Sequence, residues 1–137
     1  MSERNVEIVM RSFDAIADGN LDALLSLYDP AIQFLPLTGT RVETGGYRGH
    51  QGVRDYFAEV GEVWEEMRPH ADQVQTVGDN VVVVGGCAVR GRGSGAVTDS
   101  PLAWVIAVRD GRITSHRGFR TTDEALEAAG LGEKTGA

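Results

Sequence analysis

Cysteine and long apolar runs are almost absent from this chain of 137 residues. Cys87 is the only cysteine, which excludes an intramolecular disulfide and a cysteine-rich metal site and favours a reducing, cytoplasmic location. No apolar run approaches the roughly 18 to 20 residues that a membrane-spanning helix needs, so we expect no membrane association. The N-terminal stretch mixes charged with apolar residues, unlike a secretory signal.

Metal-binding and nucleic-acid-binding signals are missing as well. His50, His70 and His116 are the three histidines, and none is spaced from another as metal ligands on one helix or strand are, so we expect no metal. The formal net charge is −7, which disfavours binding to nucleic acid.

Two helices are predicted at the N-terminus. Residues 3–18 place apolar side chains at helical spacing. Gly19 is a helix stop and Asn20 is the N-cap of a short second helix over residues 21–28. Pro30 ends the second helix, because the residue before a proline is driven out of the helical region.

A third helix is predicted over residues 50–67, after a glycine-rich loop over residues 37–49. Its apolar side chains recur at steps of four and three residues, namely Val53, Phe57, Val60, Trp64 and Met67. We interpret His50 as part of the helix start, where a neutral imidazole would accept a hydrogen bond from a free backbone N–H. A catalytic role in a pocket is the alternative for His50.

After Pro69 the spacing of apolar residues changes from that of a helix to that of strands. Residues 70–92 predict two strands joined at residues 78–80. The glycine-rich stretch 90–95 contains Arg90 and Arg92, but no helix follows it, so we predict a wide hairpin instead of a phosphate-binding loop.

The last elements are a hairpin and a short helix. Residues 102–108 and 112–119 flank Asp110-Gly111, which is a strong two-residue hairpin signal. Thr121 and Glu124 have the spacing of a capping box that begins a C-terminal helix.

Helices that precede strands in this way predict an α+β fold. We expect three N-terminal helices packed on a curved antiparallel sheet, a short C-terminal helix, and one conical pocket between the long helix and the sheet. One domain would extend over residues 1–131, and residues 132–137 would form a frayed tail.

Five stretches together resemble the SnoaL-like, polyketide-cyclase-like branch of the nuclear-transport-factor-2-like superfamily. They are LYDPAIQF (27–34), YRGHQGVRDYF (47–57), VVVVGG (81–86), RDGRI (109–113) and EALEAAGL (124–131). The resemblance implies an α+β cone with a deep apolar pocket and a homodimer packed through the sheet. Ketosteroid isomerases, polyketide cyclases, epoxide hydrolases and dehydratases share that fold, so the fold alone does not imply an activity.

The catalytic carboxylates that this resemblance implies are not present. The isomerases carry an aspartate at the position of Leu35, and several cyclases carry one at the position of Gly118. The epoxide hydrolases have an arginine and an aspartate at the positions of Gly85 and Cys87.

His116 is the first catalytic candidate. It shares strand parity with Gly118, so it would face the pocket as an acid, a base or a hydrogen-bond donor to a ligand carbonyl, unless it is a structural histidine. Arg117 would then lie on the outer face of the sheet. Asp14 is a second candidate acid, because it lies at the edge of the apolar face of the first helix.

Seven further residues are candidates for contact with a ligand. They are Tyr28, Phe34, Tyr47, Phe57, Trp64, Cys87 and Trp104. Core packing is the alternative for the aromatic ones except Tyr47, for which a surface or dimer position is the alternative. We expect a small apolar molecule as partner and no cofactor. An isomerase, cyclase or hydratase acting on a carbonyl compound is one hypothesis, and a noncatalytic ligand-binding or dimerisation module is the other.

Overall fold

The computed structural model describes residues 2–37 and 40–130, so residue 131 and the tail predicted over residues 132–137 lie outside the described part. Helices and strands follow the predicted order. Their bounds are α1 Ser2–Ala17, α2 Leu21–Leu27, β1 Tyr28–Leu35, η1 Val42–Thr44, β2 Tyr47–Arg48, α3 Gly49–Val63, β3 Trp64–Val77, β4 Asn80–Gly91, β5 Val97–Arg109, β6 Arg112–Phe119 and α4 Thr122–Ala128. None of the described helices is long and apolar enough to cross a membrane.

The six strands form one sheet in the order β2-β1-β6-β5-β4-β3. All neighbours pair antiparallel except β1 and β6, which run parallel. The prediction of a wholly antiparallel sheet was therefore wrong at this one pair. The physical reason is that α3 and four strands, β2 to β5, separate β1 from β6 along the chain, so no hairpin turn sets their relative direction.

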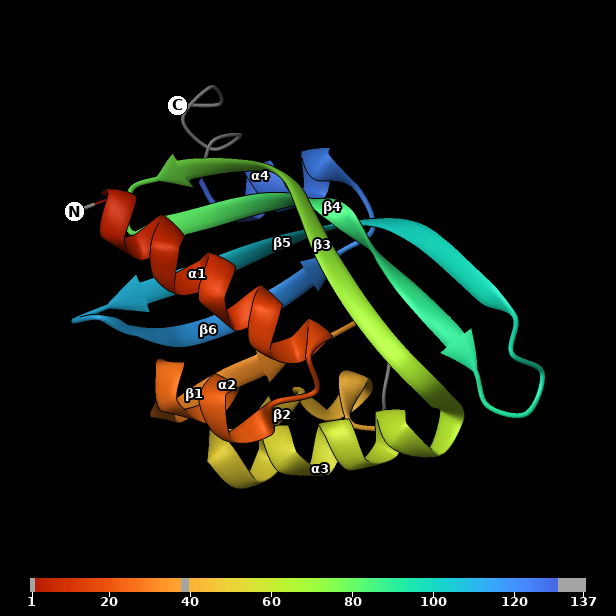
Figure 1. Ribbon diagram of the computed structural model, residues 1–137. Helices are drawn as coiled ribbons and strands as arrows, with labels where there is room; N and C mark the ends of the chain where they lie inside the picture. Colours follow the sequence, from red (N-terminus) through yellow and green to blue (C-terminus); the bar gives the residue numbers. More distant parts are fainter. Residues whose placement is uncertain (1, 38–39, 131–137) are drawn as a thin grey trace.

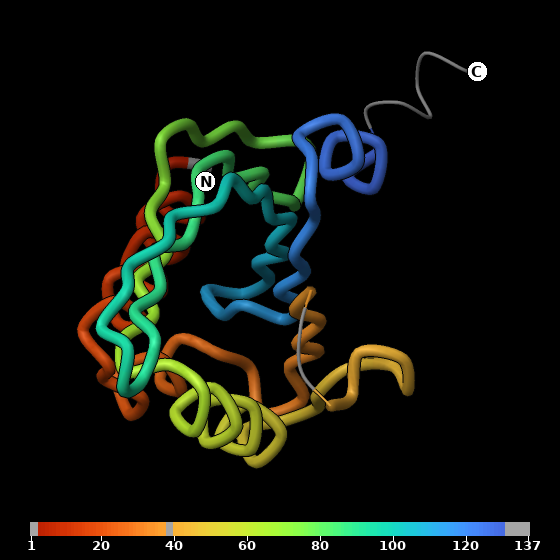
Figure 2. Tube along the Cα trace, turned by 90° about the vertical axis from the view of Figure 1, so that its right-hand side faces the viewer, coloured from red at the N-terminus to blue at the C-terminus, as the bar shows by residue number. Residues whose placement is uncertain are grey.

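The helices cover the two faces of the sheet unequally (Figure 1). On what we call the inner face, Val81, Val83 and Trp104 belong to the core that also includes side chains of α1 and α3. On the outer face, Val82 and Ala103 pack against α4. Figure 2 shows the strands and α3 surrounding a common centre, with α4 outside it.

Local signals for turns and caps are confirmed. Asn20 accepts a hydrogen bond from the backbone N–H of Ala23 at the start of α2, and Thr121 accepts one from Glu124 at the start of α4. The turn between β5 and β6 has positive φ at both Asp110 (53°) and Gly111 (78°), as a tight hairpin requires. The glycine-rich stretch after Arg90 is the predicted hairpin, between β4 and β5.

The third helix is shorter than predicted, because α3 ends at Val63 and β3 begins at Trp64. A β-bulge after Trp64 shifts the pairing of β3 with β4, so Trp64 and Met67 lie on the same face although they are three residues apart. Such a three-residue step imitates the helical period. For this reason the apolar stripe continued in the sequence beyond the end of the helix.

Candidate functional site

An apolar cavity of about 220 Å³ lies between the inner face of the sheet, α1 and α3. We call it the inner cavity. Its lining contains many large apolar side chains and few polar ones: Phe13, Ile16, Phe34, Pro36, Leu37, Tyr56, Phe57, Val60, Trp64, Met67, Pro69, Cys87, Val89, Ser100, Leu102, Trp104, His116 and Gly118. No carboxylate and no lysine or arginine is among these described lining residues.

His116 is the one histidine of this lining, and it is only 4% exposed. Its Nδ1 lies 3.3 Å from the hydroxyl of Tyr28 on β1. The ring stacks on Phe34, with 4.7 Å between the ring centroids and an angle of 22° between the planes. A hydrogen bond from Tyr28 and a stacked ring from Phe34, both on β1, thus hold the imidazole.

Burial makes both members of this pair neutral. Removal from water lowers the pKa of His116 from 6.5 to about 4, because the apolar surroundings disfavour the imidazolium ion. Burial also raises the pKa of Tyr28 well above 10.0, and Tyr56 adds to that increase. At neutral pH the pair therefore consists of an uncharged imidazole and an uncharged phenol.

The second ring nitrogen of His116 is available to the inner cavity. Among the described residues, Nδ1 has Tyr28 as partner, whereas Nε2 has no hydrogen bond within the protein. No fully buried side-chain nitrogen or oxygen in the described part of the chain lacks a partner. Nε2 is therefore not fully buried, and because His116 lines the inner cavity, we infer that Nε2 faces this space.

Six of the predicted site residues come together at this cavity. They are Phe34, Phe57, Trp64, Cys87, Trp104 and His116. Gly118 also lines it, and Arg117 lies exposed on the outer face with its guanidinium 4.7 Å from the ring centroid of Phe119. The alternation that placed His116 inward and Arg117 outward is thus what the strand adopts.

Tyr56 is a lining residue that sequence reasoning missed. It is 6% exposed on α3, with its ring centroid 4.9 Å from that of Phe34. Its position three residues after Val53 was a usable signal, because i and i+3 share a helix face.

Cys87 is poorly suited to be a nucleophile. Burial raises the pKa of its thiol to about 11, and the charge of Asp99 adds to the increase. A thiol with this pKa stays protonated at neutral pH. The side chain therefore acts as a small apolar part of the cavity wall.

Three predicted site residues are not in the lining of the inner cavity. Tyr28 is 1% exposed and lies behind His116. Asp14 is exposed on α1. Tyr47 is 1% exposed and donates a hydrogen bond to Glu59 over 2.8 Å, so its hydroxyl is bound to α3 and does not face the cavity.

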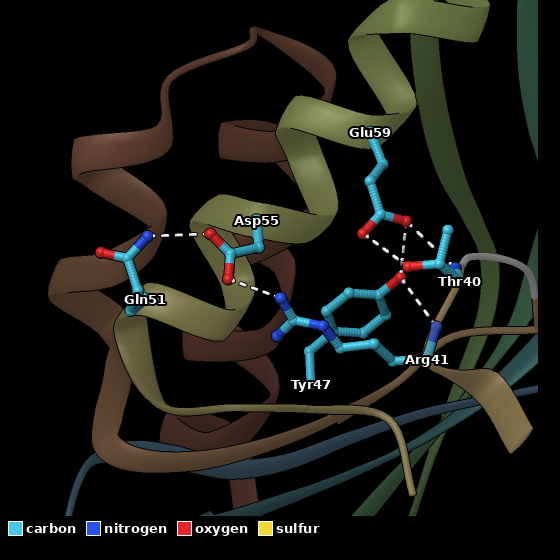
Figure 3. A network of polar contacts seen from close by, with 6 residues as sticks. All are labelled: Thr40, Arg41, Tyr47, Gln51, Asp55 and Glu59. Atoms are coloured by element: carbon cyan, nitrogen blue, oxygen red, sulfur yellow. Dashed lines mark hydrogen bonds and ion pairs between the residues drawn. The ribbon is translucent and has the colours of Figure 1, made fainter. Parts of the chain in front are cut away.

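The bond from Tyr47 belongs to a polar network that fastens the segment after β1 to α3 (Figure 3). Glu59 also accepts hydrogen bonds from the backbone N–H and the hydroxyl of Thr40, at 3.0 and 2.9 Å. Arg41 pairs with Asp55 over 2.8 Å. Hydrogen bonds lower the pKa of both carboxyl groups, first from Gln51 and then from Arg41 for Asp55, and first from the backbone N–H of Thr40 for Glu59. The network therefore supports the architecture around the site without entering the cavity.

His50 lies in the first turn of α3, as predicted, but its hydrogen bond runs in the other direction. Its Nε2 lies 3.0 Å from the backbone carbonyl oxygen of Tyr28, which can only accept. His50 is therefore a donor that ties the start of α3 to β1, and the expectation that it accepts a bond from a helix N–H was wrong. No group of three or more potential metal ligands occurs among the described residues.

Comparison with known proteins gives the family. The model of the SnoaL-like domain matches residues 9–116, while a search of curated proteins found no significant match. TerC, crystallised with polyporic acid, is 23% identical and superposes with a TM-score of 0.74, covering 92% of this chain and 98% of its own.

Two other solved structures share the fold. A putative SnoaL-like polyketide cyclase from Jannaschia sp. CCS1 is 23% identical, with a TM-score of 0.71 and coverage of 93% of this chain and 92% of its own. A hypothetical protein with a ketosteroid isomerase-like fold from Catenulispora acidiphila DSM 44928, in complex with trimethylamine, is 20% identical, with a TM-score of 0.72 and coverage of 91% and 93%. With its family model matched over residues 9–116, the chain belongs to the SnoaL-like domain family, as its motifs predicted.

Proposed function

We propose that this protein binds an apolar carbonyl compound in the inner cavity and polarises its carbonyl group through His116, without a cofactor. The observation that carries the proposal is His116, a buried and neutral imidazole that lines an otherwise apolar cavity. Small-molecule sites commonly combine apolar walls with a few placed polar groups of this kind.

The hydrogen bond to Tyr28 favours one tautomer of His116. The buried hydroxyl proton of Tyr28 needs an acceptor, and Nδ1 of His116 lies 3.3 Å away. If Nδ1 accepts, the ring proton must be on Nε2, on the cavity side. Nε2–H then donates a hydrogen bond to a ligand oxygen and stabilises negative charge that develops there during enolisation, addition or hydration.

The same environment makes His116 a weak base. With a pKa of about 4, its imidazole has little tendency to take a proton at neutral pH. The site therefore supports polarisation of a carbonyl better than abstraction of a proton. This distinction favours isomerisation, cyclisation or hydration in which water or the substrate itself carries the proton.

Binding without catalysis is the second candidate function. The observation that favours it is the missing carboxylate: position 118, where the family resemblance places an aspartate, is a glycine that lines the inner cavity. The walls and the donor would then select a ligand without transforming it.

One experiment separates these functions. A ketone such as 4-methylacetophenone, labelled with ¹³C at its carbonyl, is titrated into the protein, and its carbonyl stretch is recorded by infrared spectroscopy. We expect a bound ketone with a lowered stretching frequency. The double variant Tyr28→Phe/His116→Phe removes donor and partner together, which avoids leaving either one buried and unpaired. Tyr28→Phe alone is the matched control that keeps His116.

Exchange of the ketone's α-hydrogens in D2O then reports on catalysis. Exchange that is faster with the protein than in buffer, and is lost in the double variant, supports enzymatic polarisation. Binding and a frequency shift without faster exchange support the binding module. No binding, or a carbonyl frequency that is the same in the double variant, would overturn the proposal.

We also propose a homodimer that packs through the outer face of the sheet. On this face Val97 is 58% exposed, and Val84 and Val105 are only half-buried. The test is sedimentation velocity of Val97→Glu. Val63→Glu is the matched control, because Val63 is equally exposed but lies at the end of α3. We expect only Val97→Glu to shift the protein towards monomer, and an unchanged dimer or a monomeric wild type would contradict the proposal.

A further inference from the structure

A second, larger hollow of about 620 Å³ opens beside the inner cavity, between the α1–α2 turn, α3 and the start of β3. We call it the outer groove. Five residues line both spaces: Ile16, Phe57, Val60, Trp64 and Met67. All five are only half-buried, so a single layer of apolar side chains separates the two spaces.

The inner cavity is small for a complete ligand site. Pockets that enclose small molecules usually measure about 300–1,000 Å³, whereas the inner cavity measures about 220 Å³. The outer groove supplies the missing volume on the other side of the shared layer. Met67 in that layer has a flexible, unbranched side chain, which adapts readily to a passing ligand.

The outer groove has an apolar floor and a rim without a dominant charge. Ala15, Leu21 and Ala58 are among the residues that line the groove alone. Its charged lining residues are Asp18, Arg54, Glu65, Glu66 and Arg68. Arg90 lies 3.9 and 4.0 Å from the carboxylates of Glu65 and Glu66, which offsets their charge. A rim that carries both signs gives no general attraction for an anion or a cation.

We propose that the ligand is an elongated, uncharged carbonyl compound whose carbonyl end lies at His116 and whose apolar extension passes the shared layer into the outer groove. This inference rests on the function proposed above, because it uses His116 to orient the ligand. It adds the length of the ligand, its lack of charge, and the groove as a second binding subsite.

The test compares 4-methylacetophenone with 4-octylacetophenone, which differ only in the length of the extension. Binding is followed by the fluorescence of Trp64 and Trp104 and confirmed by calorimetry. We expect the octyl ketone to bind at least about tenfold more tightly, because its additional methylene groups leave water in the groove. Equal affinity of the two ketones would overturn the inference.

Ala58→Phe blocks the groove and leaves the inner cavity unchanged, because Ala58 is exposed on α3 and lines only the groove. We expect this variant to lose the tenfold preference and to bind the methyl ketone as wild type does. Glu62→Phe is the matched control, an exposed position of the same helix that is outside the groove lining. A preference that survives Ala58→Phe would overturn the inference.

Two further measurements test the charge of the ligand and the role of His116 separately. An octyl ketone with a terminal carboxylate should bind at least about tenfold more weakly than the uncharged octyl ketone. Equal affinity of the two would contradict the claim that the ligand is uncharged. The double variant Tyr28→Phe/His116→Phe should weaken both uncharged ketones alike. If it weakens neither, the function proposed above fails even where the length preference is found.

Discussion

His116 and His70 lie on opposite faces of the same sheet, and their surroundings change proton affinity in opposite directions. Burial in the inner cavity lowers the pKa of His116 to about 4. His70 has a side chain that is 42% exposed, and hydrogen bonds to Asp99 and then Asp72 raise its pKa above 6.5. The inner face thus holds a histidine neutral, whereas the outer face favours the same residue type as a cation.

The outer histidine spans three strands. Nε2 of His70 on β3 lies 3.0 Å from Oδ1 of Asp99 on β5, across Gly86 of β4. Nδ1 lies 3.0 Å from Asp72. Because both ring nitrogens face carboxylates, only the imidazolium can donate to both. One sheet thus holds one histidine neutral beside an apolar cavity and a second histidine as a cation that links three of its strands. We call the contacts of His70 with Asp99 and Asp72 the outer clip.

Acidification is expected to have the largest effect. The unfolded chain binds the His116 proton near pH 6.5, whereas the folded chain binds it near pH 4. The stability that this residue contributes is complete above the unfolded pKa, and about 3 kcal/mol is lost as the pH falls to 4. Urea unfolding at a series of pH values measures this loss.

His116→Gln is the control for acidification, because glutamine does not titrate. Asp55 and Glu59 also lose stabilising contacts in acid, but they do so in both proteins. The difference between the two pH profiles therefore isolates His116. Parallel profiles would contradict the lowered pKa.

Gly86→Ala should break the outer clip. The new Cβ would lie 2.7 Å from the backbone oxygen of Ser100 and 2.9 Å from both Oδ1 of Asp99 and Nε2 of His70. We expect a loss of about 1–3 kcal/mol from this overpacking and a pKa of His70 closer to 6.5. Gly61→Ala is the control, since its Cβ would meet nothing within 4 Å in α3. Equal stability of the two variants would show that the close approach is unimportant.

Tyr28→Phe sharpens the comparison on the inner face. It leaves Nδ1 of His116 buried without its partner and should cost about 1–2 kcal/mol in the free energy of unfolding. The pKa of His70 should stay unchanged, because the two histidines are on different faces. Chemical denaturation measures the free energy of unfolding, and a histidine titration by NMR measures the pKa of His70. An unchanged free energy of unfolding would contradict the hydrogen bond between Tyr28 and His116.

His70→Gln should have the smallest effect, because exposed ion pairs contribute about 0.2–1 kcal/mol. The sign of its pH dependence is opposite to that of His116. A raised pKa means that the contribution is complete below about pH 6.5 and is lost as the pH rises through the folded-state pKa. The variant should therefore differ from wild type at pH 6 and approach it at pH 9. A difference that persists at pH 9 would mean that charge is not the cause.

Local signals carried most of what could be predicted from the sequence. Helix caps and tight turns depend on residues no more than three positions apart, so they could be located directly. The caps are at Asn20 and Thr121, and the turn is at Asp110-Gly111. Strand alternation was enough to place His116 inward. A family resemblance over most of the chain then oriented these elements in one fold.

Contacts between distant segments could not be predicted in the same way. Tyr28 and His116 are 88 positions apart and meet only because β1 lies parallel beside β6. The contacts of His70 depend on the register of three strands, and a bulge in β3 made the apolar pattern continue past the end of α3. Each of these features follows from pairing geometry that no short stretch of sequence contains.

The central claim concerns the protonation of His116, and long-range ¹H–¹⁵N correlation spectra of the imidazole nitrogens between pH 8 and 4 test it most directly. The account predicts that His116 remains neutral down to about pH 4 with its proton on Nε2, while His70 is cationic up to a pH above 6.5. Titration of His116 near pH 6.5, or a neutral form with the proton on Nδ1, would contradict it.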